Sequence, residues 1–188
     1  MYFARDLLKD LNSAFIDNRL RKGIGGYALD TSVLVDYILL KRNFSSLEWL
    51  FSTKRITIYQ PVLNEIGKFL YENSLQKNYK QVYWEFQKLL NRKNVRIVDY
   101  HLENGEMLEL IKEIGLPEDP ELTLLTLKRN LEPHDAEILL ATLYENGSLL
   151  TRDKRLKEIA KLYKIQTNFP KREIAYQINL KKENKTFP

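Results

Sequence analysis

The sequence predicts an α/β fold with three α/β/α layers, in which helices flank a central parallel sheet of four to five strands. Two observations predict this class. Short apolar runs alternate along the chain with longer segments whose apolar residues recur at helical spacing. Strands that alternate with helices form a parallel sheet that is covered on both faces. The 188 residues are enough for one such domain with a substantial core.

Five short apolar runs are the predicted strands. They comprise residues 27–29, 55–59, 95–98, 148–151 and 164–167. The last of them is expected at an edge of the sheet, because it is the least apolar.

The predicted helices lie between these runs. They are expected over residues 3–20, 32–40, 61–70, 78–91, 102–114, 121–129, 133–147 and 153–162. Pro61 and Pro133 suit the first turn of a helix, where no backbone donor is needed. Gly115 and Pro117 are expected to end the helix that precedes them.

The chain divides into three predicted regions. Residues 1–25 are an amphipathic helix and a glycine-rich linker, and residues 26–168 are the main domain. Residues 169–188 form a basic tail in which one more helix is an option. A homodimer is an alternative that the amino-terminal helix and the aromatic residues of 79–86 leave open.

Composition excludes several classes of function. The chain has no cysteine, which excludes disulfide frameworks, thiolate zinc sites and thiol catalysis. No stretch approaches the roughly 20 apolar residues of a membrane span, so we expect no membrane contact and a cytoplasmic protein. The net charge of +5 favours phosphate contacts if acidic residues gather in one pocket, because the remaining surface is then more basic.

Four acidic residues are predicted to meet at one edge of the sheet. Asp30 ends the first strand, and Asp153 follows the fourth. Glu65 and Asp135 lie in the first turns of helices that border the same edge, where ligands bind in such sheets. Carboxylates this close repel one another, and Mg²⁺ or Mn²⁺ neutralises them with oxygen ligands. Taken singly, each acid is also explained as a helix cap or a solvated helix residue.

Four segments carry a family resemblance. Residues 29–36 read LDTSVLVD, 61–66 PVLNEI, 133–141 PHDAEILLA and 149–156 LLTRDKRL. In this order and spacing they resemble the motifs of the PIN-domain nucleases, among them VapC-like and archaeal-type ribonucleases. The resemblance covers about residues 26–168.

The resemblance implies a ribonuclease that depends on one or two Mg²⁺ or Mn²⁺ ions per site. It implies that Asp30, Glu65, Asp135 and Asp153 are the catalytic metal ligands, and that Thr31, Ser32 and Thr151 support them. Lys68, Arg152 and Lys154 flank these acids and are the leading candidates for contact with RNA.

Three alternatives remain open from the sequence. The protein is a toxin with the same chemistry, held inactive by an antitoxin protein, or a non-catalytic RNA-binding or assembly module with this fold. A flap-type DNA nuclease is a third reading, but the helical arch of that class is not recognised in the sequence. The segments 77–94 and 103–131 are longer than in the smallest family members.

Overall fold

All the strands of the central sheet run parallel. The computed structural model describes residues 16–38, 44–72 and 79–167. Its strands are β1 (Ile16–Asp17), β2 (Tyr27–Leu29), β3 (Ile56–Tyr59), β4 (Val95–Val98) and β5 (Ser148–Leu150). They lie in the order β1-β4-β3-β2-β5, and every neighbouring pair is parallel. This confirms the predicted parallel sheet of an α/β protein.

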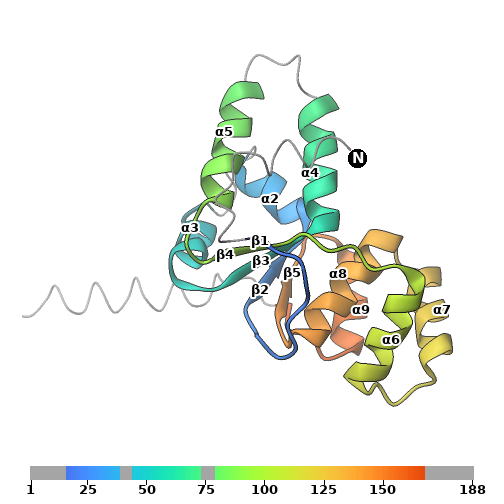
Figure 1. Ribbon diagram of the computed structural model, residues 1–188. Helices are drawn as coiled ribbons and strands as arrows, with labels where there is room; N and C mark the ends of the chain where they lie inside the picture. The colour runs from blue at the N-terminus through green and yellow to red at the C-terminus, as the bar shows by residue number, and fades with distance from the viewer. Residues whose placement is uncertain (1–15, 39–43, 73–78, 168–188) are drawn as a thin grey trace, which may run out of the picture.

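Helices cover both sides of the sheet. They are α2 (Thr31–Ile38), α3 (Phe44–Thr53), α4 (Gln60–Glu72), α5 (Tyr79–Leu90), α6 (Asn104–Ile114), α7 (Pro120–Asn130), α8 (Pro133–Tyr144) and α9 (Lys154–Leu162). Figure 1 shows α2, α4 and α5 grouped on one side of the sheet, and α6 to α9 grouped on the other. The core lies between these layers, because side chains of every strand from β2 to β5 are buried there.

Strand β2 is where the direction of the chain across the sheet reverses. The chain passes from β2 to β3 and β4 in one direction, and β5 pairs with the other side of β2. A cleft forms at such a point, outside the carboxyl ends of the strands, because the two connections leave in opposite directions. The fold therefore places a candidate site beyond Leu29 and Leu150.

Local sequence explains where the later helices begin and end. Helix α6 begins with a reciprocal capping box between Glu103 and Glu106, and it ends at Gly115 with φ +73°, the left-handed conformation that glycine adopts without strain. Asp119 begins α7, because its carboxylate accepts the backbone N–H groups of Glu121 and Leu122 at 3.0 Å each. The predicted glycine stop is confirmed.

The helix predicted over residues 3–20 is wrong at its carboxyl end. Ile16 and Asp17 form strand β1, in register with Ile97 and Val98 of β4. The Asp17 carboxylate lies 2.5 Å from Nε of Arg21 and so fixes the turn after the strand. Pairing with the sheet outweighs a helical pattern in the sequence, because β4 would otherwise expose an unpaired edge.

One further predicted strand is absent from the described residues, and one helix was not predicted. Residues 164–167 form no strand, although the N–H of Leu149 donates to the carbonyl of Gln166 at 2.9 Å. Lys164 has φ +60°, which turns the chain away after α9. Helix α3 was not predicted at all, although Asn43, a residue type that often begins helices, directly precedes it in the sequence.

Some predictions fall beyond the described residues. These are the helix over residues 3–15, residues 39–40 and the tail over 169–188. Within the described part of the chain, no helix has the length and apolar character needed to cross a membrane.

Candidate active site

Asp30 lies at the point where β2 meets α2. Its backbone N–H donates to the carbonyl of Leu150 at 3.0 Å, which continues the pairing of β2 with β5 by one residue. The side chain is only 6% exposed. Oδ2 accepts two hydroxyl hydrogen bonds, from Ser32 at 2.6 Å and from Thr151 at 2.7 Å. Two donors on one carboxylate oxygen fix its orientation.

Thr151 joins Asp30 to Asp153. The Thr151 hydroxyl donates to Asp30 and accepts the backbone N–H of Asp153 at 2.9 Å. Oδ1 of Asp153 accepts the N–H of Leu156 at 2.7 Å, so Asp153 is the N-cap of α9. The cap and the functional interpretation are compatible, because capping engages one carboxylate oxygen and the residue remains exposed at this edge.

Glu65 reaches the same region from α4. Its Oε2 accepts a hydrogen bond from the hydroxyl of Thr31, the first residue of α2. Helices α2 and α4 pack against each other, which supports this contact between residues 34 positions apart. Thr31, which directly follows Asp30 in the chain, therefore holds the Glu65 carboxylate beside the start of α2.

Asp135 completes the group from the first turn of α8. Burial raises the pKa of Asp135 to about 7, and nearby carboxylates add to the rise. Those carboxylates belong to Asp30, Asp153, Glu65 and Glu132. The other three predicted acids therefore lie within electrostatic reach of Asp135. We refer to Asp30, Glu65, Asp135 and Asp153 as the four-acid edge.

The donor set of the four-acid edge fits a hard divalent cation. Oxygen ligands with several negative charges are what Mg²⁺ and Mn²⁺ bind. Among the described residues, however, no three acidic or histidine side chains already converge closely enough to hold an ion together. Hydroxyl groups hold Asp30 and Glu65 in their present positions. Because Asp30 and Glu65 are held in place, binding of a cation would require the Asp135 and Asp153 side chains to turn toward them.

The basic residues predicted to contact nucleic acid lie around this edge in different environments. Nε of Arg152 lies 2.7 Å from Oδ2 of Asp36, a half-buried residue of α2. Lys68 is exposed on α4, where its Nζ is 3.9 Å from the Glu72 carboxylate. Lys154 is exposed at the first position of α9. Arg152 is thus partly neutralised, whereas the described contacts leave Lys154 open to solvent.

Glu137, two residues after Asp135 in α8, is a buried acid outside the four-acid edge. The side chain is 2% exposed, and burial raises its pKa. Oε1 of Glu137 accepts the N–H of Leu102 at 2.7 Å and contacts Nδ1 of His101 at 3.1 Å, so it ties the segment after β4 to α8. The sequence held a signal, because Glu137 stands between Ala136 and Ile138 in an apolar helix.

Comparison with known proteins shows which fold and family the chain has. Two similar solved structures are VapBC2 from Rickettsia felis bound to a DNA fragment from their promoter, and VapBC-1 from nontypeable Haemophilus influenzae. They are 21% and 20% identical, with TM-scores of 0.52 and 0.50, and each match covers 76% of this chain and 96% of that chain. At these identities the likeness concerns the fold. No curated protein matches the chain. The family model for the PIN domain matches residues 27–162, which include the whole four-acid edge, and the chain therefore belongs to the PIN domain family.

Proposed function

We propose that this PIN domain protein is a divalent-metal-dependent endoribonuclease that hydrolyses RNA phosphodiester bonds at the four-acid edge. The observation that carries the proposal is the raised pKa of Asp135, caused by burial and by three other acids of the same edge. A protein seldom gathers carboxylates in this way without a use for the charge, and perturbed groups of this kind cluster at functional sites. Membership of a family of nucleases supplies the reaction class.

One or two ions of Mg²⁺ or Mn²⁺ would be held by Asp30, Glu65, Asp135 and Asp153. Bound there, a divalent cation neutralises the carboxylates, makes water a stronger nucleophile and polarises a phosphoryl oxygen. The protein's own contribution is orientation. Ser32 and Thr151 fix the Asp30 carboxylate, and Thr31 fixes Glu65.

The RNA would approach from the exposed side of the edge. Lys154 is exposed beside Asp153, and Lys68 is exposed one turn of α4 after Glu65. Both residues can contact phosphates without leaving their helices. The Arg152 guanidinium pairs with the Asp36 carboxylate, so Arg152 would contact a phosphate only after leaving that ion pair.

The biological role we favour is that of a toxin controlled by an antitoxin protein. The solved structures that this fold resembles include two VapBC proteins. The chemistry would be unchanged, since the antitoxin would act by covering the edge. Expression of the chain from its native operon, followed by purification and mass spectrometry, tests this role. A small partner that copurifies and suppresses cleavage supports it, whereas full activity in the presence of every neighbouring gene product contradicts it.

Cleavage of labelled RNA tests the chemistry. Single-stranded RNA and DNA of one sequence are incubated with Mn²⁺, Mg²⁺ or EDTA, and wild type is compared with Asp30→Asn and Asp135→Asn. We expect cleavage of RNA with metal only, and a loss of more than about a hundredfold in each variant, because even supporting residues of a metal site cost 10- to 100-fold.

A matched control separates the loss of an acid at the site from the loss of a negative charge elsewhere on the surface. Glu158→Gln also removes one carboxylate, from the exposed surface of α9, and should keep wild-type activity. Cleavage that persists in EDTA, or in both aspartate variants, would exclude the mechanism. A protein that binds RNA and never cleaves it would instead be a non-catalytic binding module.

A further inference from the structure

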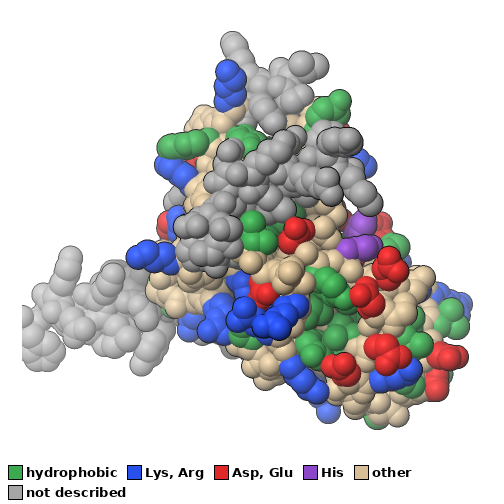
Figure 2. Space-filling model, viewed as in Figure 1, with side chains coloured by type: hydrophobic (Ala, Val, Ile, Leu, Met, Phe, Trp, Pro, Cys, Tyr) green, Lys and Arg blue, Asp and Glu red, His purple; other side chains and the backbone are tan. Residues whose placement is uncertain are grey.

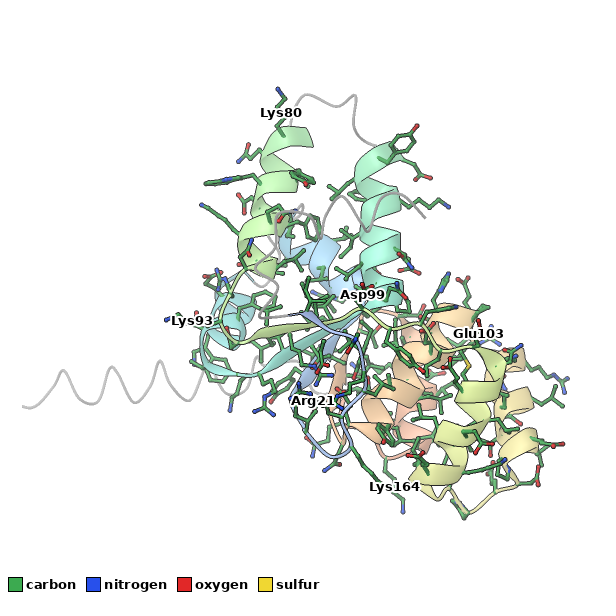
Figure 3. The ribbon with its side chains drawn as sticks, viewed as in Figure 1. Arg21, Lys80, Lys93, Asp99, Glu103 and Lys164 are labelled. Atoms are coloured by element: carbon green, nitrogen blue, oxygen red, sulfur yellow. The ribbon has the colours of Figure 1, made fainter. Side chains whose placement is uncertain are left out.

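A second charged feature lies at the opposite end of the sheet from the four-acid edge. It is a hollow of about 510 Å³ formed by β1, the turn that follows it, the end of α3 and the residues that lead into β3 and β4. Arg55 directly precedes β3, and Asn94 directly precedes β4. The hollow therefore lies at the amino ends of the strands, whereas the acids follow carboxyl ends. In Figure 3, Lys93 marks the start of β4, and Asp99 follows the end of the strand.

The lining of this hollow is strongly basic. It contains five basic side chains and one acidic one, Asp17. The basic residues are Arg21, Lys54, Arg55, Lys93 and Arg96, which we call the basic hollow. Figure 2 shows Lys and Arg side chains gathered on this face of the molecule. The local charge contrasts with the modest net charge of +5 for the whole chain.

Contacts within the basic hollow cancel part of its charge only. Asp17 pairs with Arg21, and Glu145 pairs with Arg96. Nη1 of Arg55 donates to the carbonyl of Ile24 at 2.8 Å, which is neutral, so the bond orients the guanidinium and leaves its charge. Arg55 and Lys93 are both exposed.

Arg96 adds hydrogen-bonding capacity within the lining. Its side chain is 13% exposed. Nε and Nη1 are buried and have no hydrogen-bond partner among the described residues, although Nε lies 3.8 Å from Oδ2 of Asp17. Buried donors normally find an acceptor, because an unmade hydrogen bond costs free energy. Because these two nitrogens are buried, an anion in the hollow would supply their acceptors only after the Arg96 side chain turns toward it.

We propose that the basic hollow binds the phosphate backbone of RNA, at a distance from the four-acid edge. The choice of RNA over another polyanion rests on the proposed function. The basic residues come from three separate segments, which suits a chain of phosphates better than a single small anion. The strands between the two sites have at most four residues, or about 13 Å at 3.3 Å per residue. An RNA of more than a few nucleotides, extended or folded, is therefore long enough to contact both sites.

Binding measured without cleavage tests this proposal. A fluorescein-labelled RNA hairpin is titrated with protein in EDTA, and anisotropy is recorded between about 50 and 200 mM salt, the range in which phosphate contacts show most clearly. The double variant Arg55→Gln with Lys93→Gln keeps the aliphatic stems and removes two exposed charges. We expect about fivefold weaker binding per lost contact at 0.1 M salt, and a salt slope smaller by about 0.7 for each.

The control variant carries the same change of charge elsewhere. Lys112→Gln with Lys161→Gln removes two exposed charges outside the hollow and should lower affinity less, with a slope near that of wild type. The single variants Arg55→Gln and Lys93→Gln should each give about half of the double variant's loss in binding free energy. Circular dichroism verifies that all variants are folded. A hollow variant that binds as wild type does, or no more weakly than the control, overturns the proposal.

Two further arms separate this inference from the nuclease. A labelled polyglutamate peptide should bind weakly and equally to wild type and the double variant. Loss of peptide binding with RNA binding intact overturns the RNA assignment in favour of an acidic protein. Because EDTA removes cleavage from the measurement, a protein that proves inactive but binds RNA through the hollow supports the hollow alone. If the protein cleaves RNA but the hollow variant binds RNA as tightly as wild type, the proposed function is supported and the binding role of the hollow is not.

Discussion

Two hydroxyl groups determine the orientation of the Asp30 carboxylate. Ser32 donates to it from the same turn of chain, whereas Thr151 donates from a residue 121 positions away. The sequence suggested these hydroxyls by their position beside the acids, but it did not reveal that both bind the same oxygen. That detail depends on the pairing of β2 with β5, which no local pattern encodes.

Removing the longer-range hydroxyl should therefore weaken catalysis without removing an acid. Thr151→Val keeps the shape of the side chain and deletes both the donor to Asp30 and the acceptor of the Asp153 N–H. We expect a 10- to 100-fold lower rate of RNA cleavage, about the effect of losing a supporting hydrogen bond in a metal site. Single-turnover cleavage with Mn²⁺ measures it, and Thr126→Val on the exposed surface of α7 is the control. Equal rates for Thr151→Val and wild type would show that Asp30 needs no such support.

The raised pKa of Asp135 makes stability depend on pH. The folded protein keeps the proton up to about pH 7, whereas an unfolded aspartate loses it near 3.9. Between these values the folded state binds more protons, so the metal-free protein should lose stability as pH rises from about 4 to about 7. Asp135→Asn removes this contribution.

Thermal unfolding in EDTA at several pH values measures the effect. The melting temperature of Asp135→Asn relative to wild type should rise steadily across that range, and Glu158→Gln should show no such trend. A difference between wild type and Asp135→Asn that does not vary with pH would mean that the acid titrates normally.

At the scale of elements, β1 depends on a buried ion network. Glu145 is 1% exposed at the end of α8. It accepts hydrogen bonds from the Arg96 guanidinium, from the backbone N–H of Arg21 at 2.8 Å and from the Tyr59 hydroxyl at 3.1 Å. Burial of the phenol, with the Glu145 carboxylate beside it, raises the pKa of Tyr59. One carboxylate thus joins β3, β4, α8 and the turn after β1.

Loss of the Glu145 carboxylate should be costly. Glu145→Ala leaves the Arg96 charge without its main partner, and breaking a buried pair in this way costs about 3–5 kcal/mol. Urea unfolding at pH 7 measures the loss. Arg96→Met combined with Glu145→Ala should recover part of the stability, because the orphaned charge is then gone. A single variant that loses less than about 1 kcal/mol, in the range of an exposed ion pair, would contradict this role.

Prediction of elements from sequence succeeded where the signals were local. Gly115 ends α6 and Pro133 begins α8, as their local signals predicted. Strand β1 could not be predicted, because its two residues are defined by pairing with β4, 81 positions along the chain. The strand predicted over residues 164–167 was wrong for the same reason, since in the described part of the chain a single backbone hydrogen bond joins this segment to β5.

At the scale of the whole molecule, topology joins acids that are far apart in the sequence. Asp30 and Asp153 follow adjacent parallel strands, so their proximity could be predicted from strand order alone. The positions of Glu65 and Asp135 also depend on how α4 and α8 pack, and these helices contact each other in the structure. That the residues of the basic hollow lie together was beyond prediction, because they come from segments with no shared motif.

The central claim is that the four-acid edge forms one divalent-cation site, and thermal unfolding with Mn²⁺ tests it most directly. A ligand that binds only the folded state raises its stability by an amount that grows with concentration, by about 2.7 kcal/mol at 100 times the dissociation constant. We predict that the melting temperature of wild type and Glu158→Gln rises with Mn²⁺ concentration. The melting temperature of Asp30→Asn or Asp135→Asn should hardly change. Equal shifts in all four proteins, or no shift in wild type at millimolar Mn²⁺, would contradict the account.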